Sequence, residues 1–231
     1  MKPAIHIIIL ITLVACFQSL STAREGFIKP GEKAPAFILN DQFITNDSLH
    51  NYSGEILVMM YSGRNTSDYA KYLSAKILDR FCPSPTLEQH RDNEPSPEND
   101  DCAVNVLGIA FLRGVPFFIK RRIKNYFLEE GFPSVLLDWK GEIAEGYGYD
   151  GDALSVFVVD EEGVIALADA FPLEEGAKDH AVASLDMKEV LTAAENISFT
   201  GEQKIFGVVE SLVGHRSGEP PADENPVTDT Q

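Results

Sequence analysis

The middle of the chain alternates between short, wholly apolar runs and stretches with helical periodicity. Residues 56–61 form one such run, which predicts a strand buried on both faces. A Ser-Gly-Arg turn interrupts it, and from Asn65 onwards apolar residues recur at helical spacing. We expect the side chain of Asn65, Thr66 or Ser67 to accept a hydrogen bond from the first free backbone N–H groups of this helix.

Two further apolar runs follow the same plan. Residues 104–112 predict a second buried strand, and residues 133–138 predict a third. Between them, Pro116 occupies the first turn of a predicted helix, where proline is tolerated. Phe118, Ile119, Ile123, Tyr126 and Phe127 give this helix an apolar face.

The last third of the chain contains a hairpin, a helix and a polar tail. Residues 154–166 predict a β-hairpin, because an apolar strand is followed by a polar turn with glycine and a returning strand. Residues 198–214 carry an apolar stripe at helical period, and we expect this helix to pack on the domain. Residues 215–231 are rich in Gly, Pro and acidic residues, so we expect them to be disordered.

Three of these segments resemble the redoxin, or peroxiredoxin, branch of the thioredoxin-like superfamily. Residues 31–39 match its opening pattern Gly-x-x-Ala-Pro-x-Phe-x-Leu, the strand and helix around Asn65 resemble its first βα unit, and residues 154–166 resemble its closing hairpin. The resemblance implies an α/β, thioredoxin-like fold over residues 27–197, with a central mixed β-sheet flanked by helices. An acidic loop insertion and an extra C-terminal helix would be additions to that fold.

The residues that perform chemistry in the family are missing at both matching positions. In the family the first βα turn carries a reactive cysteine, often within Cys-x-x-Cys, and the resemblance aligns that motif with Asn65, Thr66, Ser67 and Asp68. The negative charge of Asp68 would also disfavour a neighbouring thiolate. Leu154 stands where the family has the proline or arginine that faces this turn. The resemblance therefore implies a fold that in the family activates a cysteine thiol, but with no cysteine at the matching positions.

The N-terminal residues indicate export from the cytoplasm. Residues 1–23 combine a lysine, an apolar core and small residues before a cleavage point, as signal peptides do. A second interpretation fits the same stretch: residues 13–16 match a bacterial lipobox, in which Cys16 would be lipidated and anchor the protein to a membrane. Both interpretations place the body in the periplasm or the extracellular space.

Cys82 and Cys102 flank an insertion that is poor in apolar residues. Residues 83–101 contain several prolines and six acidic residues, so they are expected to be disordered. In an oxidising compartment a disulfide between the two cysteines would close this loop and stabilise the fold by about 3 kcal/mol. The alternative is that Cys82 and Cys102 form the redox centre of a thiol oxidoreductase or peroxidase.

Charge narrows the range of partners. The 231 residues include 36 acidic and 19 basic residues, for a formal net charge of -17, which argues against nucleic-acid binding. The one basic patch is Lys120, Arg121, Arg122 and Lys124 on the predicted helix after Pro116. It is either a solvated face that balances acidic neighbours or a docking surface for an acidic protein partner.

No residue pattern calls for a metal or a cofactor. The histidines are scattered and have no neighbour at ligand spacing, and no glycine-rich phosphate loop follows a strand. Arg64 and Asn65, beside a helix N-terminus, could together hold an anion, although Asp68 already complements that helix end. The sequence thus leaves two functions open: a redox-inactive binding protein, or a thiol enzyme that uses Cys82 and Cys102.

Overall fold

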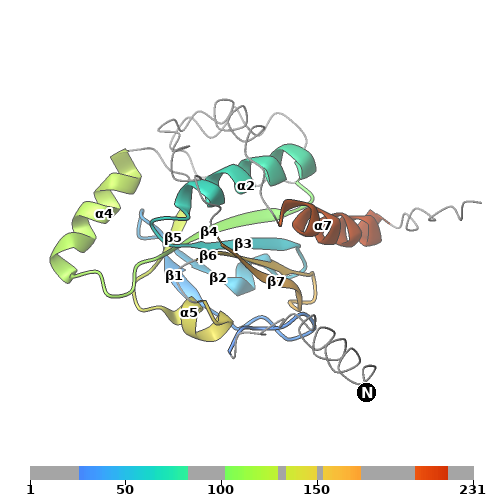
Figure 1. Ribbon diagram of the computed structural model, residues 1–231, viewed down its shortest axis with the longest axis horizontal. Coiled ribbons are helices and arrows are strands. Elements are labelled where there is room, and N and C mark those ends of the chain that lie inside the picture. The colour runs from blue at the N-terminus through green and yellow to red at the C-terminus, as the bar shows by residue number, and fades with distance from the viewer. Residues whose placement is uncertain (1–25, 83–101, 130–133, 150–152, 173–200, 218–231) are drawn as a thin grey trace, which may run out of the picture.

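The computed structural model describes residues 26–82, 102–129, 134–149, 153–172 and 201–217 (Figure 1). Several sequence predictions fall outside these residues. They concern the export signal with Cys16, the acidic insertion at 83–101 and the tail from residue 218 onwards.

A five-stranded mixed sheet forms the centre, in the order β5-β4-β3-β6-β7. Strands β3 (Leu57–Ser62), β4 (Asn105–Phe111) and β5 (Val135–Asp138) are parallel to one another. Strand β6 (Ala153–Val159) is antiparallel to β3, and β7 (Ile165–Pro172) is antiparallel to β6. The predicted strands and the predicted hairpin are confirmed.

Strand β3 is buried on both faces because it lies in the middle of this sheet. All six of its residues are buried, and the two faces belong to different core clusters. Leu57, Met59 and Tyr61 face one cluster, while Val58 and Met60 face the other. A wholly apolar run is therefore what this position requires, since alternation with polar residues would bury unpaired polar groups.

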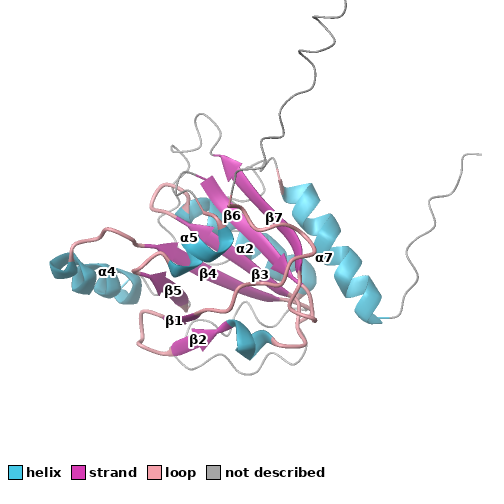
Figure 2. Cartoon of the chain, turned by 90° about the horizontal axis from the view of Figure 1, so that it is seen from below, coloured by secondary structure: helices cyan, strands magenta, loops and turns pink. Residues whose placement is uncertain are grey.

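Two helices cover one face of the sheet and shorter elements cover the other. Helices α2 (Ser67–Phe81) and α7 (Glu202–Ser217) contribute Tyr69, Leu73, Ile205 and Val209 to the same core cluster. Figure 1 shows both helices above the sheet, and Figure 2 shows α5 (Glu142–Tyr147) on the opposite side.

The N-terminal segment completes the α5 side of the sheet. Strands β1 (Ile38–Asn40) and β2 (Asn46–Ser48) form a separate antiparallel pair, followed by a 3-10 helix, η1 (Leu49–Tyr52). Phe37 and Leu39 from this segment join the core cluster that also contains residues of α5.

Helix α7 is fixed to α2 and β7 by close packing and ion pairs. Lys76 of α2 binds Glu202 at 2.8 Å, and Lys204 binds Asp169 of β7 at 2.6 Å. Gly201 precedes α7 and lies directly against Phe171, because a Cβ there would meet the phenyl ring at 1.8 Å. A residue larger than glycine would push the helix away from β7.

The last helix extends further than the sequence predicted. We expected its end at residue 214, with a tail from His215, but α7 continues to Ser217. His215 and Arg216 in its last turn complement the negative end of the helix dipole, and Arg216 also pairs with Glu161 at 3.3 Å. The prediction from composition therefore placed the end of the helix three residues too early.

Helix α4 (Phe117–Glu129) differs from the sequence prediction in what its apolar residues do. None of its described side chains is buried, and Phe118 and Tyr126, expected on an inward face, are exposed. Figures 1 and 2 both show α4 beyond β5 at the edge of the molecule. Helical period indicates that residues share a face, but it does not provide an element for that face to pack against.

A buried carboxylate connects β5, β3 and α5. Asp138 is wholly buried and accepts hydrogen bonds from the backbone N–H groups of Gly141, Glu142 and Ile143 at 2.7, 2.9 and 3.0 Å. The Tyr61 hydroxyl donates a fourth hydrogen bond to it at 2.6 Å. The pKa of Tyr61 is raised above its ordinary value, first by burial and then by this hydrogen bond to a carboxylate.

We expect Tyr61→Phe to change how stability depends on pH. In the native protein Tyr61 keeps its proton above pH 10, whereas in the unfolded chain it loses that proton, so the free energy of unfolding falls as the pH rises. The variant should lose about 1–3 kcal/mol at neutral pH, because a hydrogen bond to a charged group is removed. Its alkaline slope should be shallower by up to about 1.4 kcal/mol per pH unit.

Urea unfolding at neutral pH and at several values above pH 10 measures both quantities. Lysines and the tyrosines distant from Tyr61 contribute equally to both proteins, so the difference between the slopes reports on Tyr61 and on Tyr149, whose ring lies 4.3 Å from it. Equal alkaline slopes for the two proteins would show that Tyr61 ionises normally in the folded state.

Candidate functional site

The corner between β3 and α2 is the position at which the resemblance predicts chemistry. Strand β3 ends at Ser62 in the centre of the sheet, and α2 begins at Ser67, so the connecting turn lies at the C-terminal edge of the parallel strands. Free backbone N–H groups and the positive end of the helix dipole meet here.

Thr66 closes this turn from the inside. It is 1% exposed, and its Oγ1 accepts a hydrogen bond from the backbone N–H of Gly63 at 2.9 Å. The Thr66 backbone N–H donates to the Gly63 carbonyl at 3.2 Å, and Ser67 Oγ donates to the Arg64 carbonyl at 3.1 Å. These bonds hold the turn and α2 in a fixed relation.

The capping prediction is wrong in its details. Thr66 occupies the N-cap position, but no side-chain hydrogen bond caps the helix. The Thr66 hydroxyl bonds backwards to Gly63, and Ser67 is the first residue of the helix. Because the Thr66 hydroxyl hydrogen-bonds within the turn, it does not cap the N-terminal end of α2.

The other residues of the motif position surround Thr66 at the surface. Arg64, Asn65 and Ser67 are exposed, while Asp68 is half-buried in the first turn of α2. A carboxylate in this turn complements the helix dipole, which supports the structural interpretation of Asp68. The anion site at Arg64 and Asn65 stays a prediction.

Leu154 lies on β6, beside the end of β3 that leads into this corner. Tyr61 of β3 is paired with Ser155, so Leu154 is the next residue along β6 towards the turn. It is fully buried in the cluster that contains Tyr69 and Leu73 of α2. At this position the side chain packs under the helix and offers no polar group.

Ser155 was not identified from the sequence. Its Oγ is fully buried and has no hydrogen-bond partner in the described part of the chain. The sequence signal is a serine inside an otherwise apolar strand, which a hydrophobic pattern passes over. A buried hydroxyl without a partner costs stability. Ser155 lies on the face of β6 that packs towards Phe157 and α5, so it points away from α2 and is not part of the β3–α2 corner.

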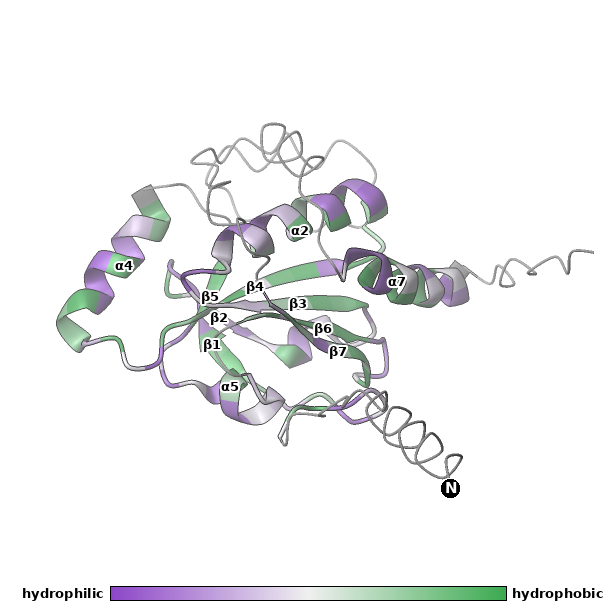
Figure 3. Cartoon of the chain, in the orientation of Figure 1, coloured by the Kyte–Doolittle hydropathy of each residue, from purple (hydrophilic) through white to green (hydrophobic). Residues whose placement is uncertain are grey.

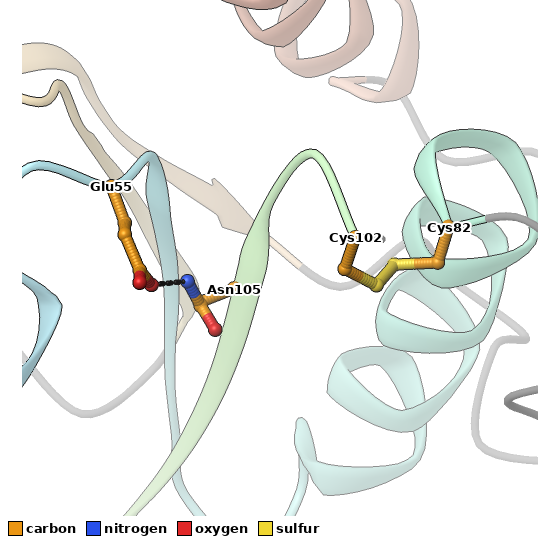
Figure 4. The surroundings of a disulfide bond; sticks show 4 residues. All are labelled: Glu55, Cys82, Cys102 and Asn105. Atoms are coloured by element: carbon orange, nitrogen blue, oxygen red, sulfur yellow. Dashed lines mark hydrogen bonds between the residues drawn. A yellow bond between two sulfur atoms is a disulfide. The ribbon is translucent and has the colours of Figure 1, made fainter. Parts of the chain in front are cut away.

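Cys82 and Cys102 form the predicted disulfide, at the end of α2 opposite to the corner. Cys82 is the C-cap of α2, and Cys102 immediately precedes the segment that leads into β4, with 4.4 Å between the Cα atoms (Figure 4). The 15 residues of α2 separate this bond from the β3–α2 corner by about 22 Å at the usual rise of a helix. The C-terminal end of a helix dipole disfavours a thiolate.

Backbone hydrogen bonds reinforce the junction around the disulfide. The N–H of Ala103 donates to the Phe81 carbonyl at 3.2 Å, and the N–H of Asn105 donates to the Ile56 carbonyl at 2.8 Å. Figure 4 shows the Asn105 side chain bound to Glu55, in the segment that precedes β3. Cys82 is buried and Cys102 half-buried, so the bond lies at a well-ordered junction of α2 and β4.

The described residues contain neither a metal-ligand cluster nor a candidate membrane span. Within these residues no cluster of three or more His, Cys, Asp or Glu side chains is arranged to hold a metal ion. No helix among them combines the length and the apolar composition that a bilayer crossing demands.

Comparisons with known proteins find similarity in structure and none in sequence. No family model and no curated protein matches the sequence. A hypothetical protein from Sinorhizobium meliloti 1021 is similar in structure, with a TM-score of 0.51 and 13% identity over 81% of this chain and 86% of that one.

Two other solved structures are similar at lower scores. The thioredoxin domain of a thiol-disulfide oxidoreductase from Bacteroides vulgatus has a TM-score of 0.43 and 15% identity, over 73% of this chain and 97% of that one. A peroxiredoxin-like protein from Aquifex aeolicus has a TM-score of 0.40 and 15% identity, over 74% and 88%.

These likenesses concern the fold alone, and the topology of the chain itself supports the fold assignment. Three parallel strands are extended by an antiparallel hairpin, and the helix that follows the central strand packs across the sheet. The chain has a thioredoxin-like fold, with a central mixed sheet flanked by helices.

Proposed function

We propose that this protein is an exported, redox-inactive binding or accessory protein of the cell envelope, built on a thioredoxin-like fold. One observation carries the proposal: the β3–α2 corner is closed by Thr66 and contains no sulfur. The described cysteines are bonded to each other at the far end of α2.

Catalysis of thiol exchange needs a thiolate in a site that lowers its pKa, with a substrate-binding surface beside it. Here the helix end that lowers a pKa carries Asn65, Thr66, Ser67 and Asp68. Leu154 fills the facing position with an apolar side chain. Replacement at two facing positions supports a scaffold that binds without electron transfer.

Export rests on residues 1–23 and on the disulfide, which persists in an oxidising compartment. Mass spectrometry of the protein recovered from expressing cells tests it. Cleavage after Ala23 means simple secretion, and a lipidated N-terminal Cys16 means a membrane anchor. A full-length chain that stays in the cytoplasm contradicts export.

The alternative function is a thiol-disulfide oxidoreductase or thiol peroxidase that uses Cys82 and Cys102. What favours it is that both sulfurs are already joined and that Cys102 is only half-buried. Against it stand the position at the C-terminal end of α2 and the backbone hydrogen bonds that fix the junction. The two functions differ in the reduction potential that they require.

We expect the disulfide to have a reduction potential below about -300 mV, as structural disulfides do. Equilibration of residues 24–231 with thiol redox buffers measures it. With dithiothreitol as the reductant, the protein should reduce neither a protein disulfide nor a hydroperoxide faster than the reductant alone. A potential near about -200 mV, with turnover that disappears in Cys82→Ala/Cys102→Ala, would establish the enzyme.

The vacated corner should still acidify a thiol that is placed in it. We expect the Asn65→Cys thiol to have a pKa below the ordinary value of about 8.5, because it faces the N-terminal end of α2. Asp79→Cys, exposed in the last turn of the same helix, is the matched control and should have a pKa above that value.

The rate of alkylation by iodoacetamide as a function of pH gives both values. The disulfide leaves one free thiol in each variant of residues 24–231. Adding Asp68→Asn to Asn65→Cys should lower the pKa further, because a neighbouring negative charge is removed. Equal thiol pKa values at the two ends of α2 would show that the β3–α2 corner does not stabilise a thiolate.

A further inference from the structure

Helix α4 carries large apolar side chains in contact with solvent. Phe117 is 84% exposed, Phe118 70% and Tyr126 53%. Its other side turns inward, where Ile119, Ile123 and Phe127 are half-buried. Lys120 lies over the Trp139 ring at 4.9 Å and helps to attach the helix beside β5.

The outward face of α4 has a defined composition. Residues spaced by three, four, seven and eight positions lie on one side of a helix, and from Phe118 this series gives Arg121, Arg122, Asn125 and Tyr126. The same five residues line one open hollow on the surface. We call this surface the α4 face. It places two guanidinium groups between two aromatic rings.

The charge of the α4 face is opposite to that of the chain. No acidic residue occurs from Arg113 to Leu128, whereas the whole chain has a formal net charge of -17. Arg121 and Arg122 are exposed, and neither forms an ion pair within the described residues. Figure 3 shows apolar and polar bands alternating along α4, whereas the strands of the sheet are mostly apolar.

We propose that the α4 face binds an acidic segment of another protein, with carboxylates on Arg121 and Arg122 and apolar side chains against Phe118. The inference rests on the proposed binding function and names the surface that performs it. Arginine forms paired hydrogen bonds with carboxylates, and exposed aromatic and arginine side chains dominate the energetics of protein interfaces. An acidic partner would complement the charge of this basic surface.

The distribution of side chains favours a protein over a lipid surface. A helix that lies in a membrane interface separates its apolar face from its basic face. On the α4 face, arginine and aromatic residues are interleaved within two turns. A second copy of this chain is also acidic overall, so the test includes self-association as one of its outcomes.

The probe is a fluorescein-labelled synthetic peptide of about a dozen residues in which Glu alternates with Leu and Phe. A matched peptide with Lys in place of Glu is the control. We expect residues 24–231 to bind the acidic peptide at least about tenfold more tightly than the basic one by fluorescence anisotropy. Raising the salt concentration from about 50 to about 300 mM should weaken binding, because exposed charges are screened.

Two variants assign the binding to the α4 face. Phe118→Ala and Arg121→Ala/Arg122→Ala should each weaken binding about tenfold or more, as loss of interface anchors does. Phe43→Ala and Lys29→Ala/Lys140→Ala remove an exposed aromatic ring and two exposed positive charges elsewhere, and should leave binding unchanged. All of these side chains are exposed, so circular dichroism should show an intact fold.

Four results would overturn the proposal. The acidic peptide binds no better than the basic one, or the α4 variants bind as the parent does. Alternatively, phosphatidylglycerol vesicles displace the peptide and bind the parent but not the variants, which identifies a lipid surface. Lastly, the parent dimerises in analytical ultracentrifugation through the same residues. Because peptide binding involves no electron transfer, these results are independent of the redox measurements that test the proposed function.

Discussion

The structure depends on the burial of β3 between two hydrophobic layers. Every residue of this strand is buried, and it pairs with β4 on one side and β6 on the other. Packing of its two faces against α2 and against the α5 side fixes where both helices lie. Burying an apolar side chain stabilises a fold by about 1.5–3 kcal/mol, so a single polar replacement in β3 would disturb both layers.

Because β3 leads directly into α2, this burial also fixes the corner between them. In a thioredoxin-like fold that corner is a favourable position for a reactive thiol, since the helix dipole and free N–H groups stabilise negative charge. Thr66 now occupies the interior of the turn, and its hydroxyl satisfies Gly63. The turn anchors the N-terminal end of α2, which packs on one face of the sheet.

The two ends of α2 are secured by different means. Hydrogen bonds from Thr66 and Ser67 hold the N-terminal end, and the Cys82–Cys102 bond joins the C-terminal end to the start of β4. The disulfide spans a separation of 20 residues, so it limits the freedom of a long connection in the unfolded chain. The disulfide of the described residues lies at the junction of α2 and the segment that leads into β4.

Helix α4 contrasts with this well-packed body. It connects the parallel strands β4 and β5, and a helix in such a connection ordinarily covers the sheet. The aromatic side chains of α4 nevertheless reach solvent. Exposing large apolar groups costs free energy in water unless a partner covers them for part of the time. This cost favours α4, and not the β3–α2 corner, as the binding surface of the protein.

The sequence by itself determined the strands of the central sheet, the hairpin, the disulfide and the absence of cysteine from the β3–α2 turn. These depend on local features: apolar runs, turn residues, and which residue types are present. Only the tertiary structure decided that Thr66 bonds backwards to Gly63 and that Asp138 joins Tyr61 to α5 across 77 positions. It also decided that Phe117, Phe118 and Tyr126 of α4 face solvent. Helical period states which side chains share a face, but only the arrangement of the other elements determines whether anything covers it.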